Sequence, residues 1–165
     1  TRKGTRSLLR GPEPIARGFK KPSGQVSFVL QQIETMLAQG LEPAEIAVFA
    51  RSKSRYEPLV KALRDKGLPV HELTHDSEQE SPPGINLGTM HRAKGLEFKV
   101  VFAYDCSEGI MPHEHTLQKY RDPADYEAAR LRERQLLYVS ITRARDEAYI
   151  TWAGRPSPFL SKQRA

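Results

Sequence analysis

Residues 85–102, INLGTMHRAKGLEFKVVF, place a dense polar cluster between two apolar runs, and this pattern limits the folds open to the chain. The run after the cluster is β-branched and aromatic, which is typical of a buried strand. Gly95 stands inside the cluster, where it lets the backbone bend without a side-chain clash. In an open α/β sheet a ligand site usually lies at the strand ends. The stretch therefore predicts two strands joined by a turn that carries a site, with polar groups from Thr89, His91, Arg92, Lys94 and Glu97.

Helix-like and strand-like runs alternate along the rest of the chain. Apolar spacing predicts helices over residues 25–39, from Ser52 or Ser54 to Gly67, and over residues 123–144, and strands over residues 45–50, 69–73 and 147–153. Ser23 is the expected N-cap of the first helix. We expect the last helix to be buried on several sides, with residues 113–122 before it irregular. The alternation predicts an α/β fold with a mainly parallel sheet of about five strands and helices on both faces.

Charge is concentrated at the start of the chain. Residues 1–21 hold seven basic groups and one acidic group, which accounts for the whole net charge of +6. Residues 1–22 also contain proline and glycine breakers, so we predict a basic, irregular N-terminal arm. Such an arm suggests nucleic acid nearby, and a solvated tail explains the charge equally well. Charge balances over the remainder, so a DNA site there must depend on placed residues.

Composition excludes several other classes. Cys106 is the single cysteine, so neither a disulfide framework nor a cysteine-based metal site is expected. No apolar run approaches the roughly 18 residues of a membrane span, so we expect no membrane contact and a cytoplasmic location. His113 and His115 lack a third ligand motif, so no metal site is expected there. We predict one domain over residues 23–160, a polar loop over residues 74–84 and a tail over residues 161–165.

The motifs resemble the second motor domain of the UvrD/Rep/PcrA family of superfamily 1 DNA helicases. T-x-H-x-x-K-G-L-E-F over residues 89–98 resembles motif V, and ERQLLYVSITRA over residues 133–144 resembles motif VI. EGIMP over residues 108–112 and IAVFARSKSR over residues 46–55 are weaker matches. The resemblance covers nearly all of the chain from residue 25 to residue 160. It implies a RecA-like domain (2A) in which the loop 74–84 stands in place of the family's 2B insertion.

The resemblance also implies nucleotide-facing residues. Arg143 matches an arginine finger that reaches the γ-phosphate of ATP, although from the sequence alone it could simply complement a helix C-terminus. Glu97 matches a glutamate that accepts hydrogen bonds from the ribose, and Gly95 belongs to the same nucleotide-facing turn. Lys94 lies between the nucleotide and DNA positions, and its role stays open between phosphate contact and coupling. Gln135 stands where members of the family usually have a second arginine.

A second set of positions matches residues that bind single-stranded DNA. Thr89 and His91 match contacts to the DNA backbone, which read no base sequence. Arg51 and Lys53 match DNA contacts of the second motor domain, although Lys53 replaces the more usual asparagine. Phe159 matches a phenylalanine that stacks on a base, and packing of this ring in the core is nearly as good an explanation.

What the sequence lacks decides the predicted activity. It contains no G-x-x-x-x-G-K-[ST] loop and no D-E-x-Q motif. We therefore predict that the chain is the C-terminal domain of an ATP-dependent DNA helicase or translocase. On its own, it should not hydrolyse ATP. ATP and Mg²⁺ would bind mainly to a first RecA-like motor domain of the same polypeptide, with none held by this chain alone. The alternative is a non-catalytic DNA-binding or interaction module with a helicase-like fold. The motor part of a helicase–nuclease is a closer variant, but no nuclease carboxylate cluster supports it.

Overall fold

The computed structural model describes residues 11–74 and 82–161. These residues form one sheet of six parallel strands in the order β1-β6-β5-β2-β4-β3. The strands are β1 Ile15–Phe19, β2 Ile46–Ala50, β3 Val70–Glu72, β4 Ile85–Thr89, β5 Phe98–Ala103 and β6 Ala144–Ala153. This arrangement confirms the predicted RecA-like α/β fold with a parallel sheet.

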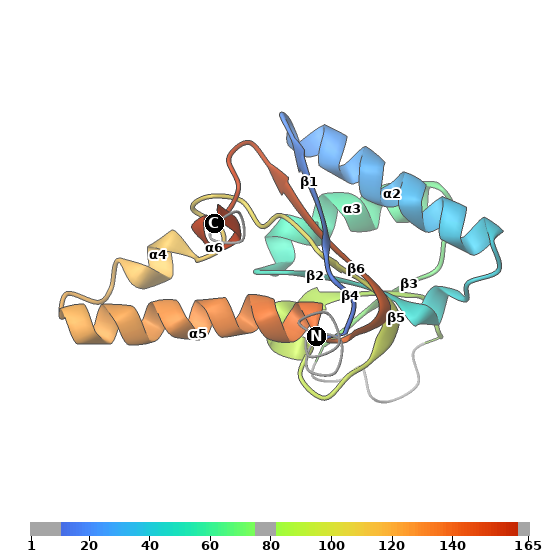
Figure 1. Cartoon of the computed structure of the whole chain (residues 1–165). Coiled ribbons are helices and arrows are strands. Elements are labelled where there is room, and N and C mark those ends of the chain that lie inside the picture. Colours follow the sequence, from blue (N-terminus) through green and yellow to red (C-terminus); the bar gives the residue numbers. More distant parts are fainter. Residues whose placement is uncertain (1–10, 75–81, 162–165) are drawn as a thin grey trace.

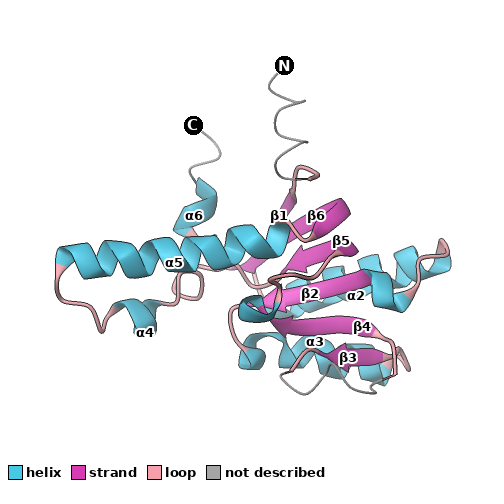
Figure 2. Ribbon diagram, turned by 90° about the horizontal axis from the view of Figure 1, so that it is seen from below, coloured by secondary structure: helices cyan, strands magenta, loops and turns pink. Residues whose placement is uncertain are grey.

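Helices cover both faces of the sheet (Figures 1 and 2). Helices α2 (Pro22–Ala38) and α3 (Lys53–Asp65) pack on one face, and α5 (Pro123–Ile141) packs on the other. The first half of α5 extends beyond the sheet, and the short helix α4 (Glu114–Leu117) lies beside it (Figure 1). The remaining elements are α6 (Pro158–Ser161) and two 3₁₀ turns, η1 (Pro43–Glu45) and η2 (Met90–Arg92).

The sheet divides the core into two clusters, and β2 shows how the sequence builds both. All five of its residues are buried. Ile46 and Val48 belong to the cluster under α2 and α3, whereas Ala47 and Phe49 belong to the cluster under α5. Successive side chains of a strand point to opposite faces, so a strand covered on both sides reads as a continuous apolar run. This is why the apolar run alone was enough to predict β2.

The predicted irregular N-terminal arm is wrong in its second half. Residues 15–19 form β1, which pairs in parallel with β6 from Ile15↔Tyr149 to Phe19↔Ala153. Most of β1 is exposed, so its sequence shows little apolar patterning, and its strand geometry comes from the neighbouring edge of β6. Helix α2 then begins at Pro22 with Lys21 as its N-cap, not Ser23. Proline fits the first turn of a helix because that turn needs no N–H donor.

The end of α5 also differs from the prediction. The helix stops at Ile141, and Ala144 already begins β6, so Arg143 lies in the tight turn between them. The buried residues of α5 form one stripe, namely Ala129, Glu133, Leu137 and Ser140. Leu131 is 55% exposed, so the helix is not buried on several sides. One face of the second half meets the sheet, while the first half extends past the sheet and has α4 and Phe159 of α6 beside it.

Three of the predicted segments fall partly outside the described residues. Residues 1–10 of the arm, residues 75–81 of the loop and residues 162–165 of the tail are not described. Residues 113–122, predicted as irregular, contain α4. Across the described residues, no helix is both long and apolar enough to cross a membrane.

Candidate nucleic-acid interface

Two surfaces at opposite ends of the sheet hold most of the predicted site residues. Strands β2 and β4 are parallel neighbours, with Ala50 opposite Thr89, so their carboxyl ends meet. Arg51 follows β2 directly, Lys53 begins α3, and His91 lies in η2 just after β4. We call the group formed by Arg51, Lys53, Thr89 and His91 the carboxyl-end surface.

The second surface lies at the amino ends of β5 and β6. Phe98 is paired with Ala144 at this end, and the Phe98 N–H donates to the Arg143 carbonyl at 2.9 Å. Glu97 and Arg143 immediately precede these two paired residues. We call Glu97 and Arg143 the amino-end surface.

The polar turn predicted from the sequence therefore has two separate ends. Thr89 ends β4 at the carboxyl side of the sheet, and Glu97 precedes β5 at the amino side. The connection over residues 90–97 must run the length of β2, which lies between β4 and β5. The sequence predicted that one turn would carry a single site at the strand ends. Only the first residues of that turn, Thr89 and His91, lie at the carboxyl ends of the strands, and Glu97 lies at the opposite end of the sheet.

A buried ion pair fixes Arg51. Its Nε and Nη2 donate to the two carboxylate oxygens of Glu133 on α5, at 2.8 and 3.0 Å. The side chains are 14% and 6% exposed. Glu133 Oε1 also accepts the His113 N–H at 2.7 Å. Paired, two-pronged bonds of this kind are among the stronger hydrogen bonds in proteins. Sequence reasoning placed Glu133 only within the motif VI match, and no local signal marks it as a partner of a residue 82 positions away.

His91 lies on the protein surface beside this ion pair. Desolvation, followed by the positive charge of Arg51, holds the pKa of His91 below its usual range, while Glu133 acts in the opposite direction. His91 is therefore neutral at pH 7, and its ring can donate one hydrogen bond.

Lys53 and Thr89 complete the carboxyl-end surface. Lys53 is exposed, and its Nζ lies 3.7 Å from a carboxylate oxygen of Glu72. Thr89 is half-buried at the end of β4. The surface thus combines a fixed guanidinium, an exposed ammonium and two uncharged donors, all of which suit phosphate oxygens.

Arg143 is folded back onto the end of its own helix. Its Nε donates to the Val139 carbonyl at 3.1 Å, and its Nη2 donates to Thr142 Oγ1 at 3.2 Å. The side chain therefore complements the helix C-terminus, which is the simpler of the two sequence-based explanations. Glu97 is exposed and lies 3.3 Å from Arg145 Nε.

Gly95 and Lys94 lie in the exposed part of the connection between the two surfaces. Gly95 has a φ of +81°, a conformation that favours glycine over residues with a side chain. The predicted backbone bend at this position is confirmed.

Phe159 packs in the core rather than presenting its ring. It is 6% exposed and belongs to the cluster under α5, with the Arg130 guanidinium 4.9 Å from the ring centroid. The packing alternative is what the structure shows. Stacking on a base would require the ring to leave this cluster, and it stays a prediction.

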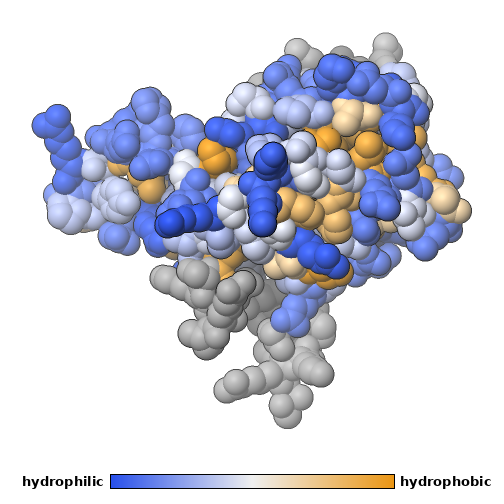
Figure 3. Space-filling view, turned by 90° about the horizontal axis from the view of Figure 1, so that it is seen from above, coloured by the Kyte–Doolittle hydropathy of each residue, from blue (hydrophilic) through white to orange (hydrophobic). Residues whose placement is uncertain are grey.

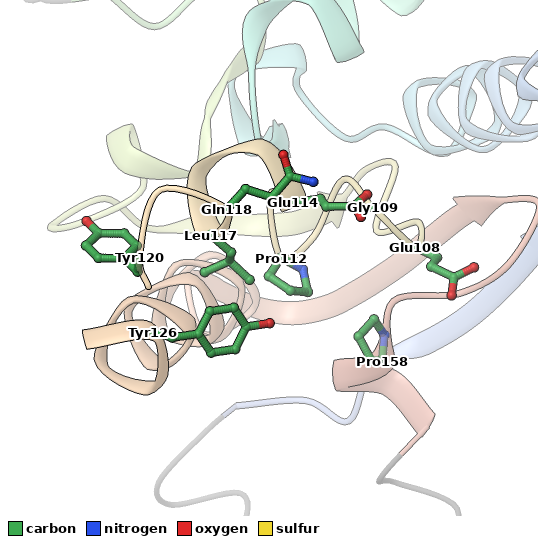
Figure 4. A pocket seen from close by; sticks show the side chains of 9 residues that line it. All are labelled: Glu108, Gly109, Pro112, Glu114, Leu117, Gln118, Tyr120, Tyr126 and Pro158. Atoms are coloured by element: carbon green, nitrogen blue, oxygen red, sulfur yellow. The ribbon is translucent and has the colours of Figure 1, made fainter. Parts of the chain in front are cut away.

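The structure also contains a pocket that sequence reasoning did not predict. It has a volume of about 540 Å³ and lies between the loop after β5, α4 and the start of α5 (Figure 4). Leu117, Pro112 and Tyr126 converge on it, with Glu108 and Pro158 at its far side (Figure 4). The arm formed by α4 and α5 is mostly polar when seen from above (Figure 3). None of the predicted site residues lines this pocket.

Comparison of the sequence with known proteins identifies a family for the chain. Residues 70–155, more than half of the chain, match the model of the UvrD-like helicase C-terminal domain. The ATP-dependent DNA helicase PcrA of Bacillus subtilis (strain 168) is 41% identical over 102 residues, which cover 60% of this chain and 13% of the relative. UvrD2, an ATP-dependent DNA helicase of Mycobacterium tuberculosis (strain H37Rv), is 34% identical over 131 residues, or 70% of this chain and 18% of the relative.

A solved structure agrees at the level of the fold. The C-terminal domain of a possible DNA helicase from Lactobacillus plantarum WCFS1 superposes with a TM-score of 0.64 at 24% identity, over 92% of this chain and 80% of that one. The chain spans less than a fifth of the length of the two curated helicases. It belongs to the UvrD-like helicase C-terminal domain family.

Proposed function

We propose that this domain supplies two parts of an ATP-dependent DNA translocase: a track for single-stranded DNA and an arginine finger. The observation that carries the proposal is the separation of the two sets of predicted residues. The carboxyl-end and amino-end surfaces lie at opposite ends of one sheet, and both residues 90–97 and α5 join them. A domain built in this way can couple ATP binding and hydrolysis at one surface to DNA binding at the other.

The carboxyl-end surface is suited to a DNA backbone of any sequence. Arg51 uses two of its five N–H groups on Glu133, so three donors are left for a phosphate. Lys53 adds an exposed ammonium, and Thr89 and His91 add neutral donors. Contacts of this kind fix the position of a strand but read no bases, which suits a protein that moves along DNA.

The amino-end surface can complete a nucleotide site but cannot form one. It offers one guanidinium and one carboxylate, without the loop of backbone N–H groups that cradles phosphates. This donor set fits the edge of a site for ATP and Mg²⁺ held mainly by a first motor domain. ATP bound there would supply the phosphoryl group that is transferred to water.

If the two motor domains close on ATP, Arg143 and Glu97 would each give up a protein partner and bind the nucleotide instead. Arg143 would leave the Val139 carbonyl and Thr142 to offset charge on the γ-phosphate, and Glu97 would leave Arg145 for the ribose hydroxyls. These bonds are individually replaceable, because Glu97 and Arg145 are exposed and Arg143 is half-buried.

ATP hydrolysis tests the finger assignment. The isolated chain should show negligible hydrolysis with or without DNA. In the complete helicase that contains this domain, Arg143→Ala should lower the rate by about 10³-fold, within the range known for arginine fingers, and spare DNA binding. Arg134→Ala, which removes an exposed arginine from α5, is the control and should leave the rate unchanged. Equal rates for wild type and Arg143→Ala would refute the finger and favour a non-catalytic module.

A further inference from the structure

Glu133 joins three segments that are far apart in the chain. Its carboxylate accepts two hydrogen bonds from Arg51 at the end of β2 and one from the His113 N–H, which follows the loop after β5. Its own helix, α5, continues for eight residues to Ile141, just before Arg143. The side chain is 6% exposed, so little water can substitute for these partners.

The geometry of the pair restricts Arg51 more than charge attraction alone would. A guanidinium held at both Nε and Nη2 is bonded along one edge, which fixes the plane of the group as well as its position. Nη1 lies on another edge of the group, where no described residue accepts a hydrogen bond from it, so it can donate to a ligand. The charges of both Arg51 and Glu133 also act on the pKa of His91, which follows the neighbouring strand β4.

We propose that Glu133 is a positioning residue for the carboxyl-end surface: it orients Arg51 so that the free edge of the guanidinium meets a DNA phosphate. The proposal rests on the proposed function of that surface. Glu133 itself does not touch DNA, because it carries the same negative charge as a phosphate and has no hydrogen-bond donor to offer one.

Charge and positioning predict opposite effects when Glu133 is neutralised. Removing a negative charge near a polyanion strengthens binding if the carboxylate acts only through its field. Loss of positioning weakens binding, because Arg51 must then be immobilised when DNA binds. Fixing one long side chain costs enough to weaken binding by about three- to ten-fold.

The test compares Glu133→Gln with Glu127→Gln in the full chain. Both substitutions remove one carboxylate from α5, but Glu127 is exposed and outside the pair. Binding of a fluorescent oligodeoxythymidylate is measured by anisotropy. We expect Glu133→Gln to bind about three- to ten-fold more weakly than wild type, and Glu127→Gln to bind equally or slightly more tightly. A Glu133→Gln protein that binds as tightly as wild type, or more tightly, would overturn the proposal.

A double variant shows whether Glu133 acts through Arg51. In a background of Arg51→Gln, adding Glu133→Gln should weaken DNA binding no further, since there is no guanidinium to orient. An additional loss equal to that of the single variant would contradict the proposal. The Gln/Gln pair also removes both buried charges together, so this variant stays informative if Glu133→Gln alone folds poorly.

The Arg51 Nε–H resonance tests positioning without DNA. It is assigned by its absence from the spectrum of Arg51→Gln. In wild type it should exchange slowly with water, and in Glu133→Gln it should exchange rapidly. Equal protection in both proteins would overturn the proposal. If the wild-type chain failed to bind DNA while the resonance behaved as expected, the proposed function of the surface would fail and the orienting role of Glu133 would stand.

Discussion

The Arg51–Glu133 pair should contribute unequally to stability depending on which partner is removed. Arg51→Gln leaves a carboxylate that is 6% exposed, with the His113 N–H as its remaining bond. Breaking a buried pair in this way costs about 3–5 kcal/mol, and the retained bond places the expected loss at about 3 kcal/mol. Glu133→Gln leaves a guanidinium that is 14% exposed and can turn towards water. Its expected cost is about 1.5 kcal/mol, comparable to one charge-assisted hydrogen bond.

The two losses should not add in the double variant. Arg51→Gln with Glu133→Gln removes both charges, so neither is left unpaired, and its expected cost is about 2–3 kcal/mol instead of the sum. The difference is the coupling energy of the pair.

Urea unfolding provides the measurement. Trp152 in β6 is the single tryptophan of the chain, so its fluorescence reports on the sheet without interference from another tryptophan. Free energies of unfolding follow from linear extrapolation. Lys61→Gln is the control, because it breaks an ion pair of 2.9 Å between Lys61 and Asp65 on the exposed side of α3. Its effect on stability should be small, because both side chains are exposed and solvent screens their attraction. An Arg51→Gln cost as small as that of the control would refute the reasoning from burial.

Three further outcomes follow from the structure. Phe159→Ala should lower the free energy of unfolding by about 3 kcal/mol, because the ring is 6% exposed; an unchanged stability with weakened DNA binding would instead favour a stacking role. Gly95→Ala should cost about 1 kcal/mol from its φ of +81° alone, since no atom lies within 4 Å of an added Cβ; no loss in urea unfolding would show that the turn relaxes. The pKa values of His91 and His113 are both lowered, by desolvation and then by Arg51, so the unfolded chain takes up protons at a higher pH than the folded chain. Stability is therefore complete above about pH 6.5 and declines as the pH falls towards the folded pKa values. The melting temperature should be lower at pH 5.5 than at pH 7.5, with a smaller difference in a variant carrying His91→Gln and His113→Gln; equal differences would contradict this assignment.

Local sequence was enough to predict elements whose own residues show the pattern that the structure requires. β2 is apolar at all five positions because both faces of the sheet are covered, and the bend at Gly95 needs a residue without a side chain. β1 was missed because an exposed edge strand needs no apolar pattern, only a neighbour to pair with. Its partner, β6, is more than a hundred residues away in the chain.

The candidate site was predictable as a set of residues but not as an arrangement. The motif resemblance selected Thr89 and Glu97 together, but the crossover over residues 90–97 carries them to opposite ends of the sheet. The helix carrying motif VI was expected to include Arg143, yet pairing of Ala144 with Phe98 begins β6 and ends the helix earlier. Glu133 was not singled out because its importance comes from Arg51, which only the fold brings into contact with it.

The salt dependence of DNA binding tests the central claim most directly. An oligodeoxythymidylate is titrated with wild type, Lys53→Ala and Arg143→Ala over a range of NaCl concentrations. Both variants remove one cation, from the carboxyl-end and the amino-end surface respectively. If Lys53 contacts a phosphate, Lys53→Ala should weaken binding and reduce the slope of log K against log salt by about 0.7, while Arg143→Ala leaves both unchanged. Equal effects of the two substitutions, or an effect of Arg143→Ala alone, would contradict the account of a DNA track at the carboxyl ends of β2 and β4.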